Sequence, residues 1–204
     1  MTQKQRSLIA LGIVALLVAG AAAVNRLTAK SPSAWTAERT SLAAKADLAL
    51  CPNPAATTAV PHGLPAFTFP CLGHGPSVNL GQLRGPLVVN IWAGTCPPCR
   101  LEAPLVQQFY AAAAGRVGVL GVVDGAYPAE DVDDALDAAR GLRLHYPSVF
   151  DASGKLVSWS KSGGIPATVL IDASGKVAYV ERGQLKSGQL SHLVRQYLGV
   201  SVDA

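Results

Sequence analysis

Cys96 and Cys99 are separated by two prolines, and this spacing is typical of thiol-disulfide chemistry. The pair directly follows a β-branched apolar run at 87–92 and opens a segment with helical spacing. We therefore expect Cys96 at the N-terminal end of a helix, where free N–H groups and the helix dipole stabilise a thiolate. Cys96, expected to be the more exposed of the two, would be the nucleophile. Cys99, one turn further on, would be the resolving thiol that displaces a mixed disulfide.

A zinc site is the main alternative for such a pair, but a four-ligand site needs a second pair at a suitable spacing. The remaining candidate ligands are irregularly spaced in a loop-like stretch: Cys51, His62, Cys71 and His74. The other two histidines match no motif that contains a cysteine. The sequence therefore predicts redox chemistry that requires no metal or other cofactor.

Strand and helix patterns alternate along the chain on both sides of this pair. Strands are expected at 67–69, 77–80, 87–92, 117–123, 146–150, 167–171 and 177–180, and helices at 96–114, 129–140 and 187–198. The helix after Cys96 is expected to bury a face formed by Leu101, Leu105, Phe109 and Ala113. This order predicts an α/β fold, with a mixed central sheet and helices on both of its faces.

The N-terminal segment is strongly apolar. Residues 8–24 consist of Leu, Ile, Val, Ala and Gly, and about 17–20 such residues just span a bilayer core. Lys4 and Arg6 precede this run, which favours a cytoplasmic N-terminus. The small residues at 21–23 would instead suit a cleaved signal peptide. Either interpretation places the remainder outside the cytoplasm, where disulfides persist.

We therefore divide the chain into three parts. Residues 1–30 form a transmembrane anchor or signal segment, and residues 31–64 form a Pro/Ala-rich tether with a short helix at 35–50. Residues 65–204 form the folded domain, a size that suits one ordinary domain.

Charge and composition exclude other classes of protein. The chain is 50% hydrophobic and 15% charged, which argues against a disordered polymer. Its net charge of +4 arises at the N-terminus, because four of the 17 Lys and Arg residues, and none of the 13 acids, precede residue 31. The neutral remainder offers no electrostatic footprint for a phosphate backbone, so nucleic-acid binding is not expected.

The stretch from Val88 to Pro104, which reads VVNIWAGTCPPCRLEAP, resembles the active-site segment of the TlpA/ResA/CcmG branch of the thioredoxin superfamily. The resemblance covers about residues 67–198. It implies a thioredoxin-like fold and a membrane-anchored, extracytoplasmic thiol-disulfide oxidoreductase.

The resemblance also assigns roles to residues around the cysteines. Asn90 is typical of this branch, and Glu102 matches its acidic residue just inside the helix, where a carboxylate would raise thiol pKa values or relay protons. The alternative for Glu102 is a solvated helix residue. Trp92 matches an aromatic residue packed beside the thiols, which would be both core and active-site wall. Thr95 departs from the family, which usually has a bulky residue there, and this changes the rim that faces the substrate.

Ile165 and Pro166 match the family's cis-proline, which would expose a backbone edge for an extended substrate. Without the resemblance, an ordinary trans proline would be expected. The preceding glycines, Gly163 and Gly164, would let another backbone approach closely.

Cys51 and Cys71 are the remaining cysteines. Four cysteines allow three connectivities, and the proximity of Cys96 to Cys99 favours Cys51–Cys71 as the second pair. We expect this disulfide to tie the tether to the start of the domain, and a second redox relay is the alternative.

The resemblance implies a reductant that acts on protein substrates such as apocytochrome c and receives electrons from a CcdA- or DsbD-type membrane partner. A DsbA/DsbE-like oxidant or isomerase would use the same residues, and the reduction potential separates the two. A Sco-like copper metallochaperone fits less well, because that family has a C-x-x-x-C motif and His145 is a poor third ligand. A redox-inert adaptor that holds a partner beside the cis-proline is the last alternative.

Overall fold

The computed structural model describes residues 40–54 and 58–204. The folded unit runs from Thr40 to Ala204. The predicted anchor or signal segment at 1–30 and the first part of the predicted tether lie outside the described residues. Within the described part of the chain, no helix has the length and apolar character that crossing a membrane requires.

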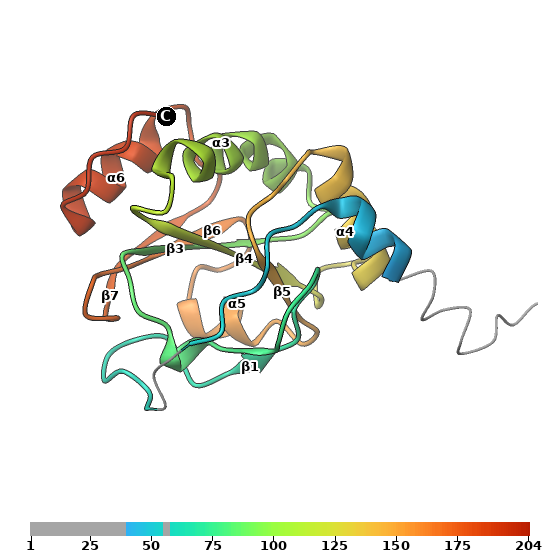
Figure 1. Ribbon diagram of the computed structural model, residues 1–204, viewed down its shortest axis with the longest axis horizontal. Helices are drawn as coiled ribbons and strands as arrows, with labels where there is room; N and C mark the ends of the chain where they lie inside the picture. Colours follow the sequence, from blue (N-terminus) through green and yellow to red (C-terminus); the bar gives the residue numbers. More distant parts are fainter. Residues whose placement is uncertain (1–39, 55–57) are drawn as a thin grey trace, which may run out of the picture. The chain divides into compact units, whose positions relative to one another are not determined.

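A five-stranded mixed sheet forms the centre of the fold (Figure 1). Its strands are, in spatial order, β5 (Ser148–Asp151), β4 (Gly118–Asp124), β3 (Leu87–Trp92), β6 (Ala167–Ile171) and β7 (Val177–Arg182). Strands β3, β4 and β5 are parallel, whereas β6 is antiparallel to β3 and β7 is antiparallel to β6. Every residue of β3 is buried, as its largely apolar run predicts for a central strand.

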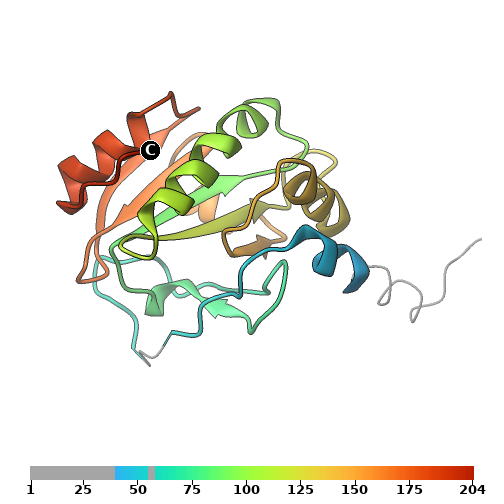
Figure 2. The same ribbon diagram turned by 45° about the horizontal axis from the view of Figure 1, so that its top comes forward.

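Helices cover both faces of this sheet (Figures 1 and 2). They are α3 (Pro97–Ala113), α4 (Val132–Gly141), α5 (Lys155–Ser160) and α6 (Gln189–Leu198). Buried residues of α3, α4 and α6 share one core cluster, and α5 contributes to the other. A short ribbon of β1 (Thr68–Phe69), β2 (Val78–Asn79) and the 3₁₀ turn η1 (Leu80–Gln82) also packs into the second cluster. The predicted α/β architecture is confirmed.

The alternation of side chains along β3 separates the two cores. Val88 and Trp92 belong to the cluster beneath α3, and Val89 and Ile91 belong to the opposite one. Asn90 lies on the same face as Val88 and Trp92, so its side chain points toward α3. The central strand therefore places one polar side chain directly beneath the helix that carries the cysteines.

The predicted buried face of α3 is partly wrong. Leu101 is 67% exposed, and Leu105 is only half-buried, whereas Phe109 and Ala113 are buried as expected. The observed face starts from Cys99 and continues at Glu102, Ala103, Val106, Phe109 and Ala113. Because Cys99 must face the sheet, the helix is rotated relative to the face predicted from its leucines.

The second predicted helix begins later than expected, at Val132 rather than at residue 129. Asp131 is its N-cap, and its Oδ1 accepts hydrogen bonds from Asp133 N at 2.8 Å and Asp134 N at 2.9 Å. Pro128 and Glu130 therefore remain in the preceding loop. Helix α5 was not predicted.

The folded unit also begins earlier than the predicted boundary at residue 65. Residues 40–46 are helical, and Ala43, Ala46 and Leu48 are buried in the core beneath α3. Ala49 N donates a hydrogen bond to His145 O at 2.8 Å. The described part of the expected tether, residues 40–54 and 58–64, thus contributes buried residues to the domain.

The Cys51–Cys71 disulfide is present, as predicted, with its Cα atoms 6.0 Å apart. Cys71 lies in a segment that pairs with the edge strand β5. Phe150 N donates a hydrogen bond to Pro70 O at 3.0 Å, and Leu72 N donates one to Ser148 O at 2.8 Å. Cys51 is 2% exposed. Backbone hydrogen bonds thus hold residues 70–72 on an edge of the sheet that would otherwise present free backbone groups, and the disulfide ties the segment around Cys51 to this covering segment.

Replacing both Cys51 and Cys71 by alanine is expected to lower the free energy of unfolding by roughly 3 kcal/mol, because a 20-residue loop is no longer closed in the unfolded chain. Urea and thermal unfolding, with Cys96 and Cys99 oxidised in both proteins, would measure the loss. The reactivity of Cys96 and Cys99 toward an added disulfide should be retained. Unchanged stability together with lost reactivity would instead assign the pair to a redox relay.

Candidate redox active site

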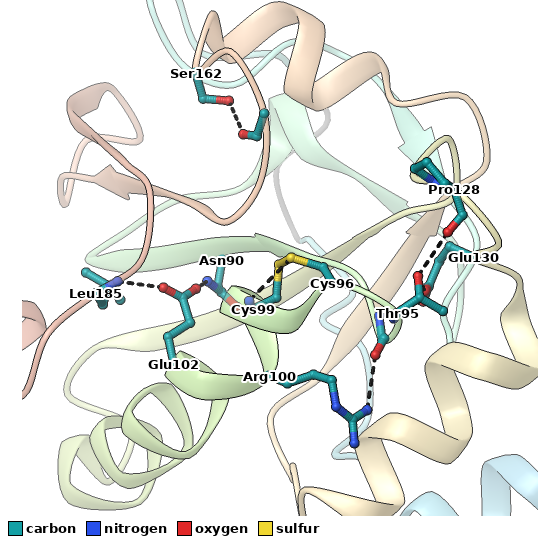
Figure 3. The surroundings of a disulfide bond; sticks show 12 residues. Asn90, Thr95, Cys96, Cys99, Arg100, Glu102, Pro128, Glu130, Ser162 and Leu185 are labelled. Atoms are coloured by element: carbon teal, nitrogen blue, oxygen red, sulfur yellow. Dashed lines mark hydrogen bonds between the residues drawn. A yellow bond between two sulfur atoms is a disulfide. The ribbon is translucent and has the colours of Figure 1, made fainter.

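The Cys96–Cys99 disulfide lies at the junction between β3 and α3 (Figure 3). Strand β3 ends at Trp92, a three-residue loop follows, and Cys96 is the N-cap of α3. Pro97 and Pro98 occupy the first two helical positions, where the helix offers no acceptor for a backbone N–H. The junction has the predicted order, with a buried strand, a short loop and then the start of a helix.

The sulfur of Cys96 acts as the capping acceptor of α3. Its Sγ lies 3.3 Å from Cys99 N, which donates toward it (Figure 3). A thiolate at this sulfur would be a charged acceptor at the positive end of the helix dipole, and both effects favour the ionised form. This geometry suits Cys96 to act as the nucleophile.

Both cysteines are buried in this oxidised form, so Cys96 is the more exposed of the two by only a small margin. Cys96 is 1% exposed and Cys99 is 0% exposed. The Cys96 side chain folds back over the first helical turn to meet Cys99, and this turns its sulfur inward. The feature of this form that would favour a thiolate at Cys96 is therefore the contact with Cys99 N rather than exposure to solvent.

The Ile165–Pro166 peptide bond is cis, as the resemblance implied. Ala167, directly after Pro166, pairs with Ile91, which directly precedes Trp92. The cis-proline therefore lies at the same end of β3 as the loop to Cys96, and Ile165 packs against the core cluster that contains both cysteines.

The two glycines before the cis-proline adopt left-handed backbone conformations. Gly163 has a φ of 81° and Gly164 a φ of 156°, and a Cβ at either position would meet no described atom within 4 Å. The backbone there is open, which suits the predicted approach of another chain.

Glu102 is fully buried, which excludes the alternative of a solvated helix residue. Its Oε1 accepts a hydrogen bond from Asn90 Nδ2 at 2.7 Å, and its Oε2 accepts one from Leu185 N at 2.8 Å (Figure 3). Burial raises the pKa of Glu102, and the two hydrogen bonds offset part of that rise. Burial, and then the nearby Glu102 carboxylate, also raise the pKa of Tyr146. A titratable acid thus lies one turn after Cys99 in a low-dielectric setting.

Trp92 and Thr95 occupy different environments. Trp92 is 1% exposed and belongs to the core cluster that contains the cysteines, so its ring is not part of the surface of this form. Thr95 is half-buried, and its hydroxyl donates a hydrogen bond to Glu130 Oε2 at 2.8 Å. The small residue at the predicted rim is therefore tied to a neighbouring loop.

Glu130 and Arg100 also lie at the site, and no sequence pattern predicted them. Glu130 accepts hydrogen bonds from the backbone N–H groups of Gly94 and Thr95, at 2.8 and 2.9 Å. Arg100, labelled in Figure 3, donates from Nη1 to Gly94 O at 3.1 Å. Glu130 follows Gly94 by 36 residues, so no local spacing signals this contact.

Among residues 40–54 and 58–204, no group of three or more His, Cys, Asp or Glu side chains is arranged to hold a metal ion.

A family model described as Redoxin matches residues 59–196, more than half of the chain. DsbE, a thiol:disulfide interchange protein of Xylella fastidiosa, is 32% identical over 134 residues, which cover 63% of this chain and 64% of that protein. ResA, a thiol-disulfide oxidoreductase of Oceanobacillus iheyensis, is 30% identical over 117 residues, which cover 56% and 58%. The chain thus spans less than two thirds of the length of these relatives.

The solved structure of DsbF from MTB, in its mixed oxidised and reduced forms, matches with a TM-score of 0.57 and 28% identity. The match covers 68% of this chain and 98% of that chain. It confirms the predicted thioredoxin-like fold with a mixed central sheet.

Replacing Glu102 by Gln is expected to flatten the pH dependence of stability. Because the folded-state pKa of Glu102 is raised above 4.5, the native state retains a proton that the unfolded chain loses, so stability falls as pH rises from about 4.5 through the folded-state pKa. Glutamine does not titrate, so the stability of the variant relative to the parent should rise over the same range. Urea unfolding between pH 4 and 8 measures this difference, and a constant difference would contradict the assignment.

Proposed function

The chain belongs to the redoxin family, and we propose that it is a thiol-disulfide oxidoreductase that exchanges disulfides with protein substrates through Cys96 and Cys99. The observation that carries this proposal is the Cys96–Cys99 disulfide at the N-terminus of α3, with Cys96 Sγ as the capping acceptor. Relatives named for thiol-disulfide interchange support the same chemistry.

In the reducing direction, the Cys96 thiolate attacks one sulfur of a substrate disulfide. The substrate S–S bond breaks, a mixed disulfide forms at Cys96, and the other substrate sulfur leaves as a thiolate that takes up a proton. The thiolate of Cys99 then attacks Cys96 Sγ and releases the second substrate sulfur. Two electrons pass to the substrate, and the protein ends with the Cys96–Cys99 disulfide of this structure. The reverse sequence oxidises a substrate dithiol.

The second step requires Cys99 to lose its proton inside the protein. Glu102 lies one turn further along α3, is fully buried and has a raised pKa, so it is suited to accept that proton. Its hydrogen bonds to Asn90 and Leu185 keep the carboxylate in place during the transfer.

The substrate segment would lie along the backbone beside Pro166. The cis-proline lacks an N–H, and the open backbone at Gly163 and Gly164 leaves space for an extended chain. Main-chain pairing of this kind accepts many sequences, which suits an enzyme that acts on protein thiols.

We place this activity outside the cytoplasm, with residues 1–30 as a membrane anchor or signal segment. The apolar run at 8–24 and the Cys51–Cys71 disulfide support this compartment. The likeness to ResA and DsbE supports the finer proposal of a reductant for apocytochrome c thiols, supplied with electrons by a CcdA- or DsbD-type membrane protein.

A Cys99→Ala variant expressed in cells is expected to accumulate a mixed disulfide at Cys96, because the resolving thiol is absent. Non-reducing electrophoresis followed by mass spectrometry would detect the adduct and identify the substrate. A matched Cys96→Ala, Cys99→Ala variant should capture nothing. The proposal fails if the single variant captures no protein and the reduced parent does not reduce insulin disulfides.

A further inference from the structure

Glu130 is a buried carboxylate that the exchange steps do not use. It is 8% exposed and lies between β4 and α4, directly before the N-cap Asp131. It therefore comes from outside the β3–α3 unit that carries the cysteines. A buried carboxylate requires hydrogen-bond donors, and the donors to Glu130 belong to the loop that precedes Cys96.

Three donors converge on this carboxylate. Glu130 Oε1 accepts from Gly94 N at 2.8 Å, and Oε2 accepts from Thr95 N at 2.9 Å and from the Thr95 hydroxyl at 2.8 Å. A carboxylate can satisfy all three, because both of its oxygens only accept. A glutamine in its place would direct an NH₂ group toward at least one N–H donor.

The loop also lies directly against α4. A Cβ at Gly94 would lie 2.7 Å from Ala138 Cβ and 2.9 Å from Asp134 O, so a larger residue would displace the loop. From the other side, Arg100 Nη1 of α3 donates to Gly94 O at 3.1 Å. Gly94 is thus held by α4 and by α3 together.

This loop determines where the Cys96 side chain begins. Thr95 is directly bonded to Cys96, whose Sγ lies 3.3 Å from Cys99 N. Hydrogen bonds weaken steeply as their geometry departs from alignment, so a loosened loop would weaken the contact that favours the thiolate.

We infer that Glu130 is a positioning residue for the nucleophile: its carboxylate fixes Gly94 and Thr95 so that Cys96 Sγ caps α3. Glu130 acts through the loop and does not touch the reacting atoms. The inference rests on the proposed function, because it takes Cys96 as the nucleophile.

The test compares the thiol pKa of Cys96 with and without the Glu130 carboxylate. The Cys99→Ala background leaves Cys96 as the reporting thiol and keeps the backbone N–H that donates to its sulfur. In this background we expect Glu130→Gln to raise the thiol pKa by about one unit, which corresponds to roughly tenfold less thiolate below that pKa. The rate of iodoacetamide alkylation of Cys96, followed by peptide mass spectrometry from pH 4 to 10, measures the shift.

The direction of the shift separates positioning from simple electrostatics. Removal of a nearby negative charge would by itself favour the thiolate and lower the pKa. Thr95→Val keeps all charges and removes the hydroxyl, which lies 2.8 Å from Glu130 Oε2 and 3.2 Å from Pro128 O, so it should raise the pKa by a smaller amount. Asp137→Asn removes a charge from an exposed side chain of α4 that pairs with Arg140, and it should leave the pKa unchanged.

An unchanged or lowered thiol pKa in Glu130→Gln, even with reduced thermal stability, would make Glu130 a purely structural residue and overturn the inference. If Glu130→Gln does not fold, Thr95→Val decides the question by the same measurement. If Cys96 in the Cys99→Ala background itself titrates like a free cysteine, near about 8.5, the proposed function fails instead.

Discussion

The hydrogen bond from Cys99 N to Cys96 Sγ is the contact on which the site depends. Pro97 and Pro98 carry no N–H, so the first backbone donor that α3 offers is that of Cys99. Its acceptor is the sulfur three residues earlier, at 3.3 Å. The two prolines therefore fix the start of the helix. They also leave the Cys99 N–H as the donor of the first turn, and it points to Cys96 Sγ, the atom that must carry negative charge during thiol exchange.

Two buried carboxylates hold the elements around this contact. Glu102 lies on α3 and bonds to Asn90 of β3 and to the backbone at Leu185, so it joins the helix to the sheet and to the segment before α6. Glu130 lies in the segment between β4 and α4, and it accepts hydrogen bonds from the loop between β3 and α3. An unpaired buried carboxylate is strongly destabilising, so each acid restricts the chain to the arrangement that supplies its donors.

Short sequence patterns predicted the features that depend on neighbouring residues, such as the central strands and the start of α3. The apolar runs at 87–92 and 167–171 have the bounds of β3 and β6, because central strands are buried on both faces. The cysteine spacing identified the helix start, whereas the cis bond before Pro166 followed only from the resemblance to a family.

The failures concern contacts between distant segments. The burial of Cys96 depends on the whole site, and the rotation of α3 depends on Cys99 facing the sheet. The packing of residues 43–51 depends on core residues that are distant in the sequence. In the sequence, Glu130 looks like one of the acidic residues that commonly begin a helix. Its proposed positioning role depends on the pairing of β4 with β3, which brings Glu130 next to the loop that follows β3.

The two disulfides differ in what the backbone presents to their sulfurs. Cys51 Sγ lies 3.3 Å from Ser148 O, and Cys71 Sγ lies 3.0 Å from His74 O. A thiolate formed beside carbonyl oxygens is repelled by their partial negative charge, so reduction of this pair would not be assisted by its surroundings. Cys96 instead faces an N–H group at a helix N-terminus. Thiol exchange proceeds through thiolates, both attacking and leaving, so these surroundings disfavour exchange at Cys51–Cys71 and favour it at Cys96–Cys99.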